Sequence, residues 1–305
     1  MAALPEIPSR RRRYSPVSDT LMPSLTPRKR QPLEALGLLG FASLPQVARL
    51  MGLSEKASRR HVRPLFDAGL ITIIPVHRAA LAPTASNDAG LLGGSAPNIF
   101  RLTRAGVKLL KELQGTSPES VGTTYGPRNS LFLAHALAVR DVFIWLRLIA
   151  HQTSTCELLR WQMDETAWID LKRTTAPHTV RPDSWFVLKV GEAVLVGLVE
   201  VDRGTERGTK RWQEKIAAYT ALFHSSRLKE TTGYQYARVL VLTPSISRRD
   251  NLATLLATHA PADLVSRFWL ADQTILQQPT LTASVWRQPG SSMLRPLVTG
   301  EAQHA

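Results

Sequence analysis

The spacing of apolar residues differs between the two halves of the chain. From residue 33 to residue 113, apolar residues recur mostly three and four positions apart, which is typical of amphipathic helices. After residue 157, short apolar runs typical of buried strands alternate with longer helical stretches. This change predicts two domains, a mainly helical one and then an α/β one, and 305 residues suffice for two cores.

Three short helices and a two-stranded wing are predicted in the first half. We expect helices at residues 33–39, 44–51 and 54–68, strands at 70–76 and 98–103, a closing helix at 104–113 and a wing-tip loop at 78–97. Ser54 is the expected N-cap of the third helix, and Gly69 is its left-handed C-cap. Pro64 should kink or shorten this helix, because proline removes a helical hydrogen bond. The helices, the wing and the "DAGL" turn resemble bacterial winged-helix DNA-binding domains.

The expected third helix has an apolar face and a cationic face. Helical spacing places three apolar side chains together, those of Val62, Leu65 and Phe66. About a quarter-turn or more away lies a basic stripe, formed by Lys56, Arg59, Arg60 and Arg63. A recognition helix has this design, since one side docks on its own domain and the other enters the DNA groove. We therefore predict that the stripe binds DNA; an ordinary solvated basic face is the alternative.

The charge balance indicates a polyanionic partner. The chain has 38 Lys and Arg against 24 Asp and Glu, a net charge of +14 and a pI near 10.6. Such an excess favours nucleic acid, through its electric field and through counterion release. Double-stranded DNA is therefore the expected partner, and a homodimer would bind paired half-sites. Residues 1–32, rich in Pro, Ser and Arg, are expected to form a disordered arm that either lies on DNA phosphates or is merely solvated.

Several classes of protein are excluded by absent features. No apolar run reaches the roughly 18 residues of a membrane span, and no apolar segment follows the arginines at 10–13 as a secretory signal requires. A single cysteine, Cys156, forms neither an internal disulfide nor a cysteine-based zinc site. We expect a cytoplasmic protein with no membrane partner. Phosphate-loop, nucleophile-elbow and zinc-helix motifs are also missing.

An α/β domain is predicted at residues 129–275. It follows a winged-helix domain at 33–114 and a linker at 115–128, and it precedes a C-terminal extension at 276–305. Helices are expected at 130–150, 206–224 and 247–259, and strands at 157–161, 183–190, 194–201, 237–243 and 267–270. This order predicts a central mixed sheet that begins with an antiparallel meander.

Three carboxylates stand at the ends of two expected strands. A two-residue turn at Gly191 and Glu192 would pair residues whose numbers sum to 383, which places Asp183 directly opposite Glu200. Their Cβ atoms would then lie about 5 Å apart on one face. Asp202 lies two residues beyond Glu200 and would share that face. The three carboxylates are therefore expected to converge at one end of the sheet.

A bound cation would relieve the repulsion between these carboxylates. Carboxylate oxygens suit Mg²⁺ or Mn²⁺, so we predict a metal site at Asp183, Glu200 and Asp202. The alternative needs no metal, since the cluster could be neutralised as an ion network by Arg181, Arg203 and Lys215.

The spacing of these residues resembles the PD-(D/E)xK nuclease core. "PD" at 182–183 is followed by sixteen residues and then by "EVD" at 200–202, and the order of elements also agrees. The resemblance implies a restriction-endonuclease-like domain in which Asp183 and Glu200 bind Mg²⁺ and are catalytic. The usual lysine is replaced by Asp202. Lys215, four residues before Tyr219 on the next helix, is the candidate replacement, because a lysine moved onto this helix is a known variation of the superfamily.

The whole arrangement is similar to the replication-relaxation family. The similarity rests on a winged helix and then "HALAVRDV", "RPDSWFVL", "EVDRGTE", "KIAAY" and "VWRQP". It implies DNA binding in the replication or maintenance of plasmids and other mobile elements. Two functions stay open: a metal-dependent nuclease, and a winged-helix regulator with a degenerate nuclease core. His135, on an apolar helix, is expected to be packed rather than catalytic.

Overall fold

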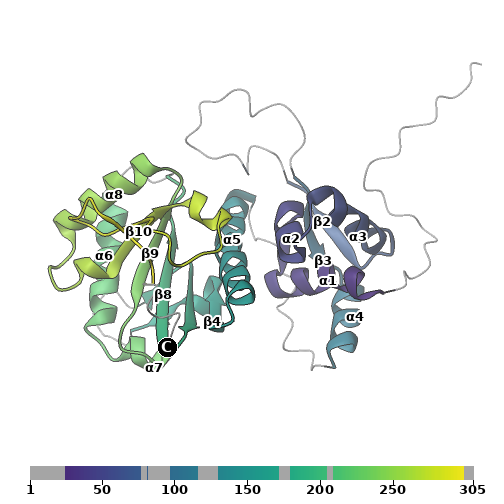
Figure 1. The fold of residues 1–305 in the computed structure, drawn as a ribbon, viewed down its shortest axis with the longest axis horizontal. Helices are drawn as coiled ribbons and strands as arrows, with labels where there is room; N and C mark the ends of the chain where they lie inside the picture. Colours follow the sequence, from purple (N-terminus) through teal and green to yellow (C-terminus); the bar gives the residue numbers. More distant parts are fainter. Residues whose placement is uncertain are drawn as a thin grey trace, which may run out of the picture. The chain divides into compact units, whose positions relative to one another are not determined.

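The computed structural model describes residues 25–76, 81, 97–115, 130–171, 179–204 and 209–298 (Figure 1). These residues form two compact units, and the boundary falls between Phe132 and Leu133. Unit 1 contains the described residues before this boundary, and unit 2 contains those after it. Most of the wing tip expected at 78–97 and of the linker expected at 115–128 lies outside the described residues.

Unit 1 combines short helices with a small antiparallel sheet. In chain order its elements are α1 (Pro27–Leu39), β1 (Phe41–Ser43), α2 (Leu44–Met51), α3 (Glu55–Asp67), β2 (Ile71–Ile74), β3 (Ile99–Leu102) and α4 (Arg104–Gln114). The strand order is β1-β3-β2, and both pairs are antiparallel. The expected helices and strands are all present, and β1 is an additional strand.

The first helix begins earlier than the sequence pattern predicted. Residues 27–32 were assigned to a disordered arm, but α1 starts at Pro27 and includes Arg28, Lys29 and Arg30. Proline is favoured in the first turn of a helix, where its missing N–H is not needed. The rest of the expected arm, residues 1–24, lies outside the described residues.

The third helix ends where expected, although it contains Pro64. Ser54 caps its start by accepting a hydrogen bond from the Ala57 N–H, as predicted. The helix runs through Pro64 to Asp67, so the predicted shortening is wrong. Pro64 lies in the last turn, where its carbonyl still accepts the Ala68 N–H at 3.0 Å. Gly69 then adopts the predicted left-handed conformation, with φ of 69°.

Unit 2 is built on a mixed sheet. Its sheet strands are β4 (Cys156–Met163), β7 (Ser184–Val190), β8 (Ala193–Val201), β9 (Arg238–Thr243), β10 (Phe268–Asp272), β11 (Trp286–Arg287) and β12 (Leu294–Arg295). In the part of unit 2 that the structure describes, they form one seven-stranded sheet in the order β12-β11-β10-β9-β8-β7-β4. Strands β8, β9 and β10 are parallel, and their other neighbours are antiparallel. The expected C-terminal extension therefore contributes two strands to this sheet.

Helices cover both faces of this sheet (Figure 1). The remaining elements are α5 (Ser130–Gln152), η4 (Asp164–Ala167), β5 (Ile169–Asp170), β6 (Thr179–Val180), α6 (Lys210–Phe223), α7 (Arg227–Thr232), α8 (Ile246–His259), η5 (Val265–Arg267) and η6 (Gln273–Gln277). One core joins α5 to the face that carries Phe186 and Leu188. The other joins α6, α7 and α8 to the face that carries Trp185 and Val187. No helix among the described residues is long and apolar enough to cross a membrane.

The register of β7 and β8 is the one that the turn predicted. Val190 pairs with Ala193 and Ser184 pairs with Val199, so the paired numbers sum to 383 throughout. Gly191 has φ of 57°, which a glycine in this turn adopts without strain. The ladder ends at the pair of Ser184 and Val199, one position before the expected pair of Asp183 and Glu200. The Asp183 N–H donates to the carbonyl of Val199, which is already the partner of Ser184, so the strict register does not continue to Glu200.

Candidate functional site

Asp183 is held just before β7 by three separate contacts. Its backbone N–H donates to the Val199 carbonyl at 3.0 Å, which ties it to β8. Its Oδ2 accepts a hydrogen bond from the Val201 N–H at 2.7 Å, and its Oδ1 lies 2.9 Å from Nε2 of His135. The carboxylate of Asp183 is therefore fixed between the end of β8 and helix α5.

Glu200 lies on β8 under helix α6. Its side chain is only 2% exposed, and both of its oxygens are bound. Oε2 accepts a hydrogen bond from Lys215 Nζ at 2.6 Å, and Oε1 accepts one from the Tyr219 hydroxyl at 2.5 Å. The two donors lie one turn apart on α6 and so reach the same carboxylate. Lys215 points toward this site as expected, while its catalytic role stays a prediction.

His135 belongs to this site, although the sequence favoured a packed histidine. It lies on α5, and its side chain is 32% exposed beside Asp183. One signal was present: Val139 and Val142 follow it by four and seven residues and are buried on the side of α5 that faces the sheet. A histidine on such a face requires a polar partner. That requirement would have favoured a contact with the strand-end carboxylates.

The charges of this cluster shift one another's ionisation. Burial would raise the pKa of Asp183, but the hydrogen bond and charge of His135 and the charge of Lys215 hold it below its usual range. Burial would lower the pKa of His135, but Asp183 raises it above the ordinary value. For Glu200, burial outweighs the charge of Lys215 and raises the pKa. Burial and the charge of Glu200 raise the pKa of Tyr219, which therefore remains a hydrogen-bond donor.

Asp202 does not join the other two carboxylates. Its Oδ2 accepts hydrogen bonds from Arg248 Nη2 at 2.7 Å and Nε at 3.0 Å, and its Oδ1 accepts the Gly204 N–H at 2.6 Å. Strand β8 ends at Val201, so the strand alternation behind the prediction no longer applies at Asp202. Among the described residues, no three His, Cys, Asp or Glu side chains are arranged to hold a metal ion. The expected convergence of three carboxylates is therefore not observed.

The contact between His135 and Asp183 predicts a pH dependence of stability. A histidine whose pKa is raised on folding stabilises the protein fully below the unfolded value of about 6.5, and this contribution is lost as the pH rises through the folded value. His135→Gln should therefore lower the free energy of unfolding at pH 6 by on the order of 0.5–1 kcal/mol, and by less at pH 9. Urea unfolding in EDTA at both pH values measures this. An equal loss at both values would contradict the ion pair.

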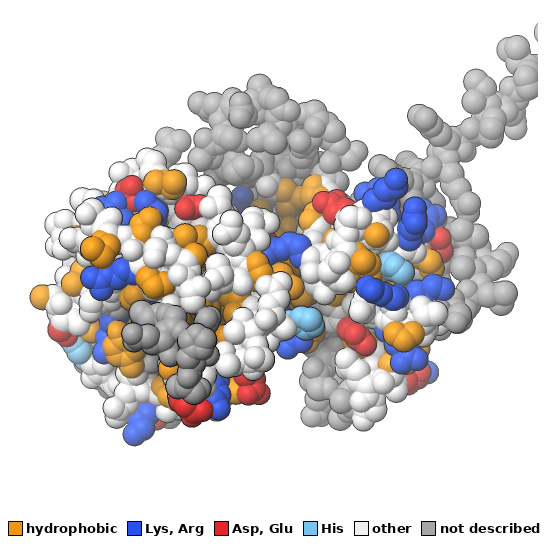
Figure 2. All heavy atoms as spheres, viewed as in Figure 1, with side chains coloured by type: hydrophobic (Ala, Val, Ile, Leu, Met, Phe, Trp, Pro, Cys, Tyr) orange, Lys and Arg blue, Asp and Glu red, His pale blue; other side chains and the backbone are white. Residues whose placement is uncertain are grey.

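The predicted DNA-binding stripe lies on helix α3 of unit 1. Val62, Leu65 and Phe66 are buried as expected. Figure 2 shows Lys and Arg side chains gathered over the part of unit 1 that contains α3. Lys56 and Arg60 are exposed, and Arg59 is partly exposed. Arg63 differs from them, because its Nε lies 2.8 Å from Oδ2 of Asp67.

Comparison with known proteins identifies one family. The family model described as replication-relaxation matches residues 33–237. This span includes α3 and the five residues of the carboxylate site, which are His135, Asp183, Glu200, Lys215 and Tyr219. No curated protein and no solved structure matches the chain.

Proposed function

We propose that this chain, which belongs to the replication-relaxation family, binds double-stranded DNA and nicks it with the help of a divalent metal ion. Membership of the family suggests a role in the replication of mobile elements. The process served would be the replication or maintenance of a plasmid or a similar element. We assign DNA binding to unit 1 and nicking to the carboxylate site of unit 2.

DNA binding by unit 1 is supported by the design of α3. The helix docks through its apolar face and presents Lys56, Arg59 and Arg60 on the other side. A helix of this kind, followed by the β2–β3 pair, fits a winged helix-turn-helix that enters the major groove. The net charge of +14 adds an attraction to phosphate that does not depend on sequence.

One observation carries the nicking proposal: Lys215 Nζ lies 2.6 Å from Glu200, and the charge of Lys215 also lowers the pKa of Asp183. In the nuclease pattern a lysine follows the second acidic residue by two positions, and here Asp202 occupies that position. Lys215 of α6 lies beside Glu200 instead. In this place its ammonium group would stabilise the negative charge that develops on a phosphate during cleavage. Tyr219 would hold Glu200 in position, and His135 would hold Asp183.

The donor set fits a hard divalent ion such as Mg²⁺ or Mn²⁺. Asp183 and Glu200 would be its protein ligands, since the two carboxylates are close enough for the charge of Asp183 to raise the pKa of Glu200. Each carboxylate oxygen retains acceptor capacity beyond its present hydrogen bond. Asp183 and Lys215 are 19% and 25% exposed, so solvent reaches the site. A bound ion would polarise the phosphate and lower the pKa of an attacking water.

A second function, DNA binding without cleavage, is favoured by the hydrogen bonds of the same carboxylates. All six oxygens of Asp183, Glu200 and Asp202 already accept a hydrogen bond from, or lie within bonding distance of, a donor of the protein. Each of these oxygens therefore has a protein donor in the absence of a metal ion. In this case the unit 2 core would be a scaffold, and the protein would be a regulator of replication or transcription.

Incubation of supercoiled plasmid with the protein distinguishes the two functions. With Mg²⁺ or Mn²⁺ we expect conversion of supercoiled DNA to the nicked form, and no conversion in EDTA. Asp183→Asn should reduce nicking to background, because the amide loses the charge of a metal ligand while keeping its shape. Conversion by the variant at the wild-type rate would indicate a contaminating nuclease. Absence of nicking by the wild type with either metal, on DNA that it binds, would support the regulator.

A further inference from the structure

A tryptophan and an arginine form an exposed pair just before Asp183. The indole of Trp168 is 43% exposed, which is unusual for so large an apolar ring. The guanidinium carbon of Arg181 lies 4.6 Å from the centre of this ring. Among the residues that the structure describes, Arg181 forms no ion pair with a carboxylate. The pair thus offers both a ring surface and a cation to solvent.

The β5–β6 ladder explains why these two side chains meet. Ile169 pairs with Val180, and the same register continued by one residue sets Trp168 opposite Arg181. Side chains alternate along a strand, so Trp168 and Arg181 lie on the other face from Ile169 and Val180. The latter two are buried in the core with residues of α6. The core thus fixes the ladder, and the ladder displays the pair outward.

The pair also lies close to the carboxylate site. Arg181 precedes Asp183 by two residues, about 7 Å along an extended chain. The intervening Pro182 is buried, which limits movement between them. A DNA strand whose phosphate reached Asp183 would bring its neighbouring nucleotide to Trp168 and Arg181.

We propose that Trp168 and Arg181 bind an unpaired nucleotide of the DNA strand at the carboxylate site. The base would stack on the indole, and its phosphate would bind the guanidinium. Bases inside an intact duplex are covered by their neighbours, so only an unpaired base can stack in this way. The substrate class is therefore DNA with a single-stranded segment. This inference rests on the proposed function for its location, but it concerns binding and needs no cleavage.

Binding measured in EDTA tests this inference separately from nicking. Fluorescence anisotropy would compare a labelled duplex with the same duplex carrying a short single-stranded gap. We expect the full-length protein to bind the gapped DNA more tightly, and Trp168→Ala to weaken that binding roughly 10-fold while intact-duplex binding stays unchanged. Trp168→Phe should retain most of the gapped-DNA affinity. Arg181→Ala should weaken it and reduce its salt slope by about one.

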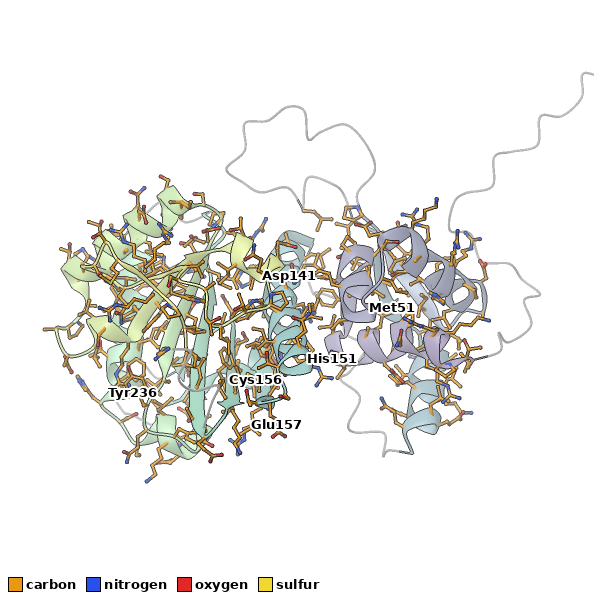
Figure 3. The ribbon with its side chains drawn as sticks, in the orientation of Figure 1. Met51, Asp141, His151, Cys156, Glu157 and Tyr236 are labelled. Atoms are coloured by element: carbon orange, nitrogen blue, oxygen red, sulfur yellow. The ribbon has the colours of Figure 1, made fainter. Side chains whose placement is uncertain are left out.

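The matched control is Tyr236, another exposed aromatic ring that contacts an arginine. Figure 3 labels Tyr236 in unit 2. Its side chain is 54% exposed, and the guanidinium of Arg267 lies 4.4 Å from its ring centre. It precedes β9, whereas the carboxylates lie at the carboxyl end of the neighbouring strand β8. Tyr236→Ala should therefore leave gapped-DNA binding unchanged.

Two results would overturn the inference: equal binding of gapped DNA by Trp168→Ala and the wild type, or no preference for gapped DNA in the wild type. If Trp168→Ala fails to fold, Arg181→Ala carries the same test. The two proposals can also fail separately. If the protein never nicks the plasmid but Trp168→Ala loses the preference for gapped DNA, nicking is refuted and the nucleotide site is supported. Normal nicking with no effect of Trp168→Ala would refute only the nucleotide site.

Discussion

Replacement of Lys56, Arg59 and Arg60 by alanine should weaken double-stranded DNA binding by about 10²–10³-fold at 0.1 M salt. These three cations lie on α3, and none of them forms an ion pair with a carboxylate among the described residues. Each phosphate contact releases counterions, so the slope of log K against log salt should fall by about three. Titration of a labelled duplex at several salt concentrations measures both quantities.

Arg63 should contribute less than the other three cations of the stripe. Its guanidinium is already bound to Asp67, so a phosphate must compete with that carboxylate. Adding Arg63→Ala to the triple variant should therefore change the salt slope by well under one. This ranking follows from the structure, because the sequence alone treats the four cations as equivalent.

A charge-matched control separates a recognition helix from a general charge effect. Arg104, Lys108 and Lys111 of α4 belong to the same unit, and their replacement by alanine removes the same three charges. We expect this variant to lose less than about 10-fold in affinity. Equal losses in the α3 and α4 variants would show that only the net charge of unit 1 matters. The assignment of α3 to the DNA groove would then be wrong.

The register of the site was predictable because local chemistry determines it. A two-residue turn with a glycine fixes the pairing of β7 with β8, and this pairing brings the start of β7 beside the end of β8 that carries Glu200. Trp212, Ile216 and Tyr219 recur at helical spacing and are all buried on one side of α6. Lys215 lies on the flank of that side, so its direction followed from the same pattern.

Contacts between distant segments were not predictable from these patterns. His135 meets Asp183 only because α5 packs across the sheet, and Asp202 meets Arg248 only because α8 begins beside the end of β8. Neither meeting leaves a periodic signal in the sequence. Strands β11 and β12 each have two residues, too few for any apolar alternation to mark them. The early start of α1 was not predicted because its first turns are rich in Arg and Pro, which is typical of disordered segments.

Replacement of Lys215 by methionine should both abolish nicking and destabilise unit 2. Glu200 is 2% exposed, and without Lys215 its charge would be buried with only the Tyr219 hydroxyl as a side-chain partner. Breaking a buried ion pair in this way costs about 3 kcal/mol. The pKa of Glu200 is already raised by burial, and removal of Lys215 would raise it further. The loss of stability should therefore be larger at pH 8 than near pH 4, because Glu200 is more fully protonated at the lower pH in both the folded and the unfolded state.

Lys210→Met is the matched control, since Lys210 is an exposed lysine of the same helix and should leave both stability and nicking near wild type. Urea unfolding at pH 8 and pH 4 and the plasmid assay measure the two effects. Glu200→Gln combined with Lys215→Met should restore most of the stability, because no unpaired charge remains buried, but it should not restore nicking. If Lys215→Met behaved like Lys210→Met in both assays, the contact with Glu200 would be neither structural nor catalytic. If Lys215→Met lost stability but still nicked the plasmid, a cation other than Lys215 would have to stabilise the charge on the phosphate.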